Sequence, residues 1–97
     1  MNYTTKEIVE SFVNGWTDEG ASASGGRLYV EGKNYCQVLI NYSTVIALRD
    51  DFGNIWINDQ VYSKTTTKHQ NRLKKHAPSA EIVDEGYIMD IKAELWE

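Results

Sequence analysis

The spacing of apolar residues divides the chain into helical and extended segments. Residues 4–16 predict a helix, because apolar side chains recur at helical intervals and Thr4 and Glu7 have the spacing of a capping box. The apolar face of this helix consists of Ile8, Val9, Phe12, Val13 and Trp16. We expect this face to cover a sheet, since an apolar helix stripe must be buried against another element.

A second helix is predicted over residues 64–76, where three threonines near the start are suited to capping and Pro78 follows the end. At about 3.6 residues per turn, two different stripes run along this helix. The basic stripe consists of Lys64, Lys68, Arg72 and Lys75. The stripe expected to face the core consists of Thr66, His69, Leu73 and Ala77.

Segments rich in β-branched and aromatic residues predict strands over residues 27–31, 35–49 and 55–58. The middle segment is too long for one regular strand, so we expect a break or bulge at Asn41 or Ser43. Residues 50–54 have the composition of a hairpin loop. Residues 17–26 are small and glycine-rich, and they predict a flexible loop.

The C-terminal segment alternates apolar and polar residues from Tyr87 onward, which predicts a strand with one wet face. Ala, Glu and Leu also favour helix, so a terminal helix over residues 91–96 is the alternative. With the strand, the element order is α-β-β-β-α-β. We therefore predict a single α+β domain over residues 1–97, with an antiparallel sheet of about four strands and both helices packed on one of its faces.

Charge is distributed unevenly along the chain. The formal net charge is −4, but residues 64–76 carry five cations and no acid, so the remainder has a formal charge of −9. An acidic surface attracts basic partners. With Trp56 as an aromatic anchor, the candidate partner-binding residues are pairs of acids at predicted turns: Asp18, Glu19, Asp50, Asp51, Asp84 and Glu85. Trp96 is a second candidate anchor, and solvated turn charges are the alternative interpretation of the acid pairs.

The residues able to carry chemistry show no catalytic signature. Cys36 is the only cysteine, so this sequence has no internal disulfide, and its apolar neighbours are typical of a buried residue. His69 and His76 lie two helical turns apart, too far for one ion without a third ligand. We therefore expect no enzymatic activity, no cofactor and no metal. With no signal peptide or membrane-spanning run, we expect a soluble cytoplasmic protein.

Two stretches resemble known groups of proteins. Asn-Tyr-Ser-Thr-Val-Ile-Ala at residues 41–47, with Tyr-Ser-Lys-Thr-Thr-Thr-Lys-His at residues 62–69, resembles a pattern in small uncharacterised proteins of phages and mobile elements. Ser-Phe-Val-Asn-Gly-Trp at residues 11–16 is similar to a stretch in small acidic anti-CRISPR proteins. These resemblances imply a protein that acts by occupying a surface on a larger host protein.

Two functions from different classes are open at this point. The first is a non-enzymatic inhibitor or interaction protein of phage type, which docks on a host defence or nucleic-acid-handling protein through its acidic turns. The alternative is a nucleic-acid-binding module that uses the basic stripe, with Gln70 and Asn71 within reach of a base edge. A homo-oligomer joined through edge strands is a third hypothesis.

Overall fold

The computed structural model describes residues 3–15, 17, 20–34 and 36–96. Its elements follow in the order α1 (Thr5–Asn14), β1 (Ser22–Ala23), the 3-10 helix η1 (Ser24–Gly26), β2 (Leu28–Lys33), β3 (Cys36–Asn41), β4 (Thr44–Asp50), β5 (Ile55–Asn58), α2 (Lys64–His76), β6 (Glu81–Val83) and α3 (Glu85–Leu95). The strands form one sheet in the order β1 to β6. All neighbours are antiparallel except β5 and β6, which run parallel and are connected through α2.

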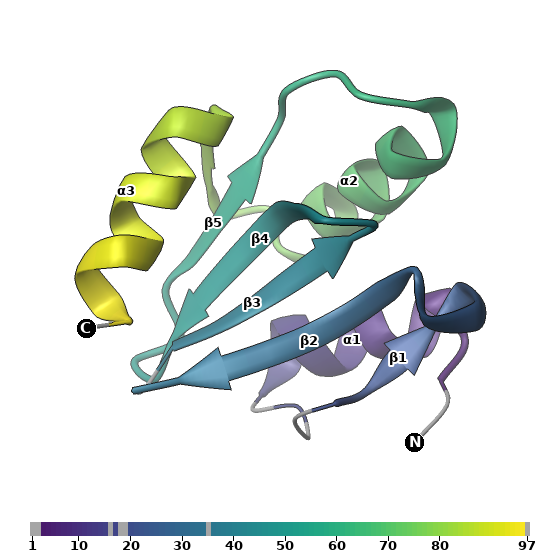
Figure 1. Cartoon of the computed structure of the whole chain (residues 1–97), viewed down its shortest axis with the longest axis horizontal. Helices are drawn as coiled ribbons and strands as arrows, with labels where there is room; N and C mark the ends of the chain where they lie inside the picture. Colours follow the sequence, from purple (N-terminus) through teal and green to yellow (C-terminus); the bar gives the residue numbers. More distant parts are fainter. Residues whose placement is uncertain (1–2, 16, 18–19, 35, 97) are drawn as a thin grey trace.

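Helices cover both faces of the sheet: α1 and α2 lie behind it in Figure 1, and α3 lies in front. The core under α1 and α2 includes Ile8, Phe12, Leu39, Ile57 and Leu73. The core under α3 includes Val38, Leu48 and Ile88. The α+β class is therefore confirmed, whereas the smaller, wholly antiparallel sheet with one helical face is wrong.

The central elements lie where the sequence placed them. The long extended segment breaks at a two-residue turn, Tyr42 and Ser43, between β3 and β4, and β5 and α2 have the predicted bounds. The capping box of α1 is also present, since Thr4 and Glu7 exchange hydrogen bonds of 2.9 and 3.1 Å. These elements were predictable because local propensity, turn chemistry and burial all favour the same structure.

The predicted C-terminal strand is wrong, because residues 85–95 form α3. Asp84 caps this helix by accepting a hydrogen bond from the Tyr87 backbone N–H at 2.8 Å. Ile88, Ile91 and Leu95 recur at helical intervals and pack on the sheet, whereas Tyr87 is exposed. The alternative helix over residues 91–96 therefore covered the second half of α3. The short strand β6 before it was not predicted.

Two further details differ from the sequence-based expectation. The N-cap of α2 is Ser63, whose Oγ accepts a hydrogen bond from the Thr66 N–H, so capping by the threonines is wrong. Within the segment expected to be a flexible loop, the structure places β1 and η1. The backbone N–H of Thr17, which is buried, also donates to the Gln37 side chain at 3.0 Å. A single domain over residues 1–97 stays a prediction.

Candidate functional site

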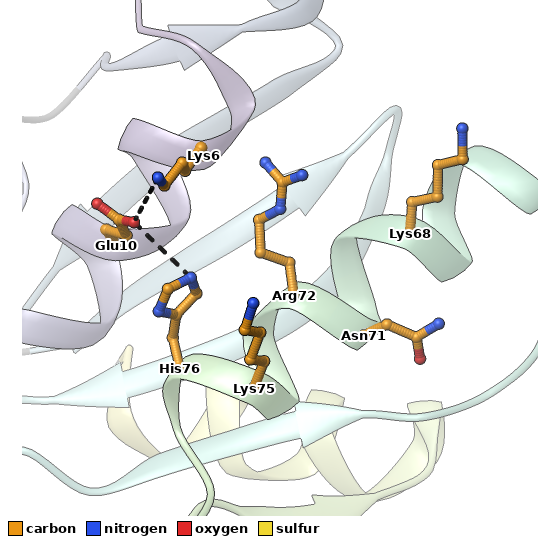
Figure 2. Close-up of a pocket in the computed structure, with 7 residues that line it drawn as sticks. All are labelled: Lys6, Glu10, Lys68, Asn71, Arg72, Lys75 and His76. Atoms are coloured by element: carbon orange, nitrogen blue, oxygen red, sulfur yellow. Dashed lines mark ion pairs between the residues drawn. The ribbon is translucent and has the colours of Figure 1, made fainter.

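A groove of about 630 Å³ lies between α1 and α2. The two helices turn their apolar sides to the sheet, so the flanks that face each other outside the core are polar. Figure 2 shows the side chains that line the groove: Lys6 and Glu10 from α1, and Lys68, Asn71, Arg72, Lys75 and His76 from α2. Cations therefore dominate this surface.

Glu10 is the one carboxylate among the residues that line the groove. Its Oε1 lies 3.9 Å from Lys6 Nζ and 3.8 Å from His76 Nε2, so its charge is directed to one end (Figure 2). Arg72 Nη1 donates to Thr5 Oγ1 at 3.3 Å and joins the two helices. One acid thus offsets only part of the positive charge.

The predicted basic stripe has no acidic partner in the described part of the chain. No carboxylate there lies within 4 Å of the cationic nitrogens of Lys64, Lys68, Arg72 or Lys75. The neighbouring Lys74 differs, because its Nζ forms an ion pair with Asp59. These contacts do not support an internal pairing of the stripe with the acids of its own domain.

The opposite side of α2 is buried, and its composition agrees with the predicted core stripe: Thr66, His69, Leu73 and Ala77 are all buried. Gln70 joins them, and its Nε2 donates to the backbone oxygens of Asn58 and Gln60 at 2.7 and 2.9 Å. The expected contact of Gln70 with a base is therefore wrong. Asn71 is exposed, between the lysines of the stripe.

Residues 41–47 and 62–69 meet in a buried polar network at the start of α2. Thr66 Oγ1 donates to Asn41 Oδ1 at 2.7 Å. Asn58 Nδ2 donates to the Val45 carbonyl at 3.0 Å and to the Tyr62 hydroxyl at 2.8 Å. These bonds fix α2 against the ends of β3 and β5, so they set the direction of the basic stripe.

His69 lies beside this network. It is buried, and its Nε2 has no hydrogen-bond partner among the described residues. Burial, with a smaller contribution from the charge of Arg72, lowers the pKa of His69 below 6.5. His69 is therefore a neutral core residue at pH 7, whereas His76 lies at the groove.

The predicted acidic residues do not form one surface. Asp50 is only 8% exposed, and its carboxylate accepts hydrogen bonds from the Phe52 and Asn54 backbone N–H groups at 3.0 and 2.8 Å, which closes the hairpin turn. Asp84 caps α3. Asp51 and Glu85 are exposed.

These pairs lie at opposite ends of β5. Its first residue, Ile55, pairs with Arg49 beside the Asp50–Asp51 turn, and its last, Asn58, pairs with Val83 beside Asp84. Asp18 and Glu19 lie outside the described residues. Trp56 is half-buried in the core under α3, which limits its use as an anchor.

The structure gives little support for a reactive thiol at Cys36 or for a metal site. Cys36 is fully buried, and burial together with the charge of Asp50 raises the pKa of its thiol to about 11. Among the described residues, no three His, Cys, Asp or Glu side chains are grouped as a metal site requires. None of the helices built from those residues has the length and apolar character to span a bilayer.

The contribution of α1 to the groove was not predicted. Lys6 and Glu10 lie far from the basic segment in sequence, and only the packing of α1 beside α2 brings them together. The spacing of Lys6 and Glu10, four residues apart on a helix, was the available signal, since it places both side chains on one polar side.

These features define a small α+β protein with a cation-lined groove between two helices. The model for a family of unknown function, DUF8033, matches residues 4–90, so the chain belongs to this family. No curated protein and no solved structure matches the chain.

Proposed function

We propose that this protein is a non-enzymatic binding protein that holds the phosphate backbone of nucleic acid along α2 and in the groove beside it. One observation carries the proposal: the row Lys64, Lys68, Arg72 and Lys75 has no carboxylate within 4 Å in the described structure. Cations without an acidic partner in the described part of the chain are available to neutralise phosphates and to release the counterions bound to them.

The geometry of the row supports a linear polyanion. Lys64 and Lys75 are eleven residues apart, which is about 17 Å along a helix. Lys6 widens the positive surface on the side of α1. A straight, rigid row of this length matches an extended chain of phosphates better than a single small anion.

The net charge of −4 opposes this binding only weakly. At physiological ionic strength, interactions between exposed charges fade over about 8 Å. A phosphate in contact with α2 is therefore influenced mainly by the cations of the stripe. No carboxylate of the acidic pairs at the two ends of β5 lies within 4 Å of a stripe cation in the described structure.

The other hypothesis, an inhibitor that docks on a host protein through acidic turns, has less support. Its proposed contacts are divided between two ends of the sheet, and Asp50 uses its carboxylate within its own turn. An anti-CRISPR-like role stays a prediction, and an assay against the host nuclease tests it separately.

The proposal is tested by fluorescence anisotropy with a labelled 20-base-pair DNA duplex, titrated between 50 and 200 mM salt. We expect Lys68→Ala to weaken binding several-fold at low salt. It should also reduce the slope of log affinity against log salt by about 1, because one phosphate contact is lost. Lys33→Ala removes a lysine that is also exposed, on β2, and serves as the matched control.

The proposal is wrong if both variants bind like the wild type, or if the duplex at 50 mM salt binds no better than an uncharged polymer. Single-stranded RNA and DNA of the same length, measured in parallel, show whether the row prefers one form of the backbone.

A further inference from the structure

The edge of the sheet formed by β6 is a second candidate binding surface. It is separate from the proposed nucleic-acid site. Strand β6 is the last strand in the sheet order, with β5 on one side only. Asp59 N–H donates to the Val83 carbonyl at 2.9 Å, so Val83 turns its backbone groups toward β5. Because successive residues alternate, Ile82 turns its N–H and C=O toward the open edge.

A groove of about 670 Å³ runs along this edge. Its apolar part includes Ile82, which is 48% exposed, and Tyr87, which is 51% exposed. Glu81 and Asp84 add two carboxylates, and no cation of the described chain lies within 4 Å of either. The groove thus combines an unpaired strand edge, exposed apolar side chains and acidic residues. Of these acids, Asp84 also caps α3, and Asp59 is paired with Lys74.

We propose that the β6 edge binds an extended peptide segment in which lysine or arginine alternates with apolar residues. The backbone of the segment pairs with the N–H and C=O of Ile82, as when a strand is added to a sheet. Its apolar side chains contact Ile82 and Tyr87, and its cations lie near Glu81 and Asp84. The charge of the groove selects a basic occupant.

A second copy of the chain fits this edge less well. The basic segment of the protein forms α2, so most of its backbone groups are already paired within the helix. The opposite edge strand, β1, contains two residues and no cation. A basic segment from another protein is therefore the occupant that the surface favours.

The test uses a fluorescein-labelled peptide of alternating lysine and valine, with a glutamate–valine peptide as the charge-reversed probe. We expect the lysine peptide to bind the wild-type protein at least ten-fold more tightly than the glutamate peptide. Ile82→Pro removes the outward N–H without removing a bond to β5, and should weaken binding at least ten-fold. Ile82→Val retains the N–H and should bind like the wild type.

A second pair of variants tests the charge. Glu81→Lys should weaken binding of the lysine peptide at least five-fold, whereas Glu94→Lys, an exposed change near the other end of α3, should not. Hydrogen exchange in the wild-type protein gives a readout that needs no variant. The Ile82 amide should exchange rapidly alone and more slowly with the peptide.

Three results would overturn the proposal. The first is equal binding of the lysine peptide by the wild type and Ile82→Pro. The second is an Ile82 amide whose exchange the peptide does not slow, which decides the question even if Ile82→Pro does not fold. The third is a wild-type dimer, seen by sedimentation, that Ile82→Pro dissociates, because a second copy then occupies the edge.

Discussion

The cationic surface of α2 and the acidic groove at β6 differ in how they are built. The cations of the first come from one continuous segment, and a buried network with Asn58 at its centre fixes the helix that carries them. The acids of the second come from β6 and the turn into α3, beside a strand with an open edge. The two regions meet at the ion pair of Lys74 and Asp59.

This comparison teaches that binding capacity arises here in two ways. On α2 the backbone groups between the helix ends are paired within the helix, so side-chain charge is what the exposed side offers to a partner. At β6 the backbone itself is available, and charge selects the partner. Changes that disturb one region and preserve the other therefore test whether the two are separate.

The largest expected effect is from Ile88→Ala. Ile88 is the one fully buried residue of α3 and anchors the helix on its face of the sheet. We expect a loss of about 3 kcal/mol in the free energy of unfolding, measured with urea, because a large apolar side chain is replaced by a cavity. Met89→Ala, at a 41% exposed position on the same helix, should cost much less.

The functional consequence of Ile88→Ala should be selective. Peptide binding at β6 should weaken, because α3 supplies Tyr87 to that groove, while DNA binding on α2 should be retained in the folded fraction. Equal loss of both activities at a temperature where the variant is folded would show that the two regions are one site.

For Asn58→Ala we expect a smaller decrease in the free energy of unfolding, about 2 kcal/mol, because buried hydrogen-bonding groups lose their partners. The side chain of Asn58 bonds the Val45 carbonyl, the Tyr62 hydroxyl and the Gln60 N–H. Asn71→Ala on the exposed side of α2 should change stability by less than about 0.5 kcal/mol. Equal urea midpoints for the two variants would contradict the structural importance of the network.

The smallest effect is a pH dependence from His69, whose pKa is lowered in the folded protein. Above about pH 6.5 the imidazole is neutral in both states and stability is at its full value. Below that pH the unfolded chain takes up a proton that the folded state resists, so the free energy of unfolding decreases until the pH passes the folded pKa. Urea unfolding at pH 8.0, 6.5 and 5.5 measures this decrease.

The contribution of His69 is isolated by comparing variants. His69→Gln should show a smaller decrease between pH 6.5 and 5.5 than the wild type. If His69→Gln and the wild type lose the same stability over this range, His69 does not resist protonation in the folded state.

Much of this architecture was predictable from local signals, and the errors have physical causes. The basic helix was predicted with its bounds because its polar side, its buried side and its flanking Pro78 agree. The strand predicted from Tyr87 onward was wrong because Ile91 and Leu95 fit both a period of two and a helical stripe. The third residue of that stripe, Ile88, fits the helix alone. The choice between them depends on Asp84, which caps the helix.

The two binding surfaces also differ in how far the sequence could predict them. The basic stripe was visible because its members are neighbours along one helix. Lys6 joins it only through tertiary packing, and the groove at β6 depends on a parallel pairing with β5 that no local pattern specifies. Sequence periodicity therefore predicted the surface carried by one element and missed the surface assembled from several.

The most direct test of the central claim is an NMR titration of the ¹⁵N-labelled protein with a short DNA duplex at 50 mM salt. The account predicts that the amide signals of Lys6, Lys68, Asn71 and Lys75 shift together, while those of Ile82 and Tyr87 do not. It also predicts that the shifts diminish at 200 mM salt. Shifts centred on β6, or no shifts at 50 mM salt, would contradict it.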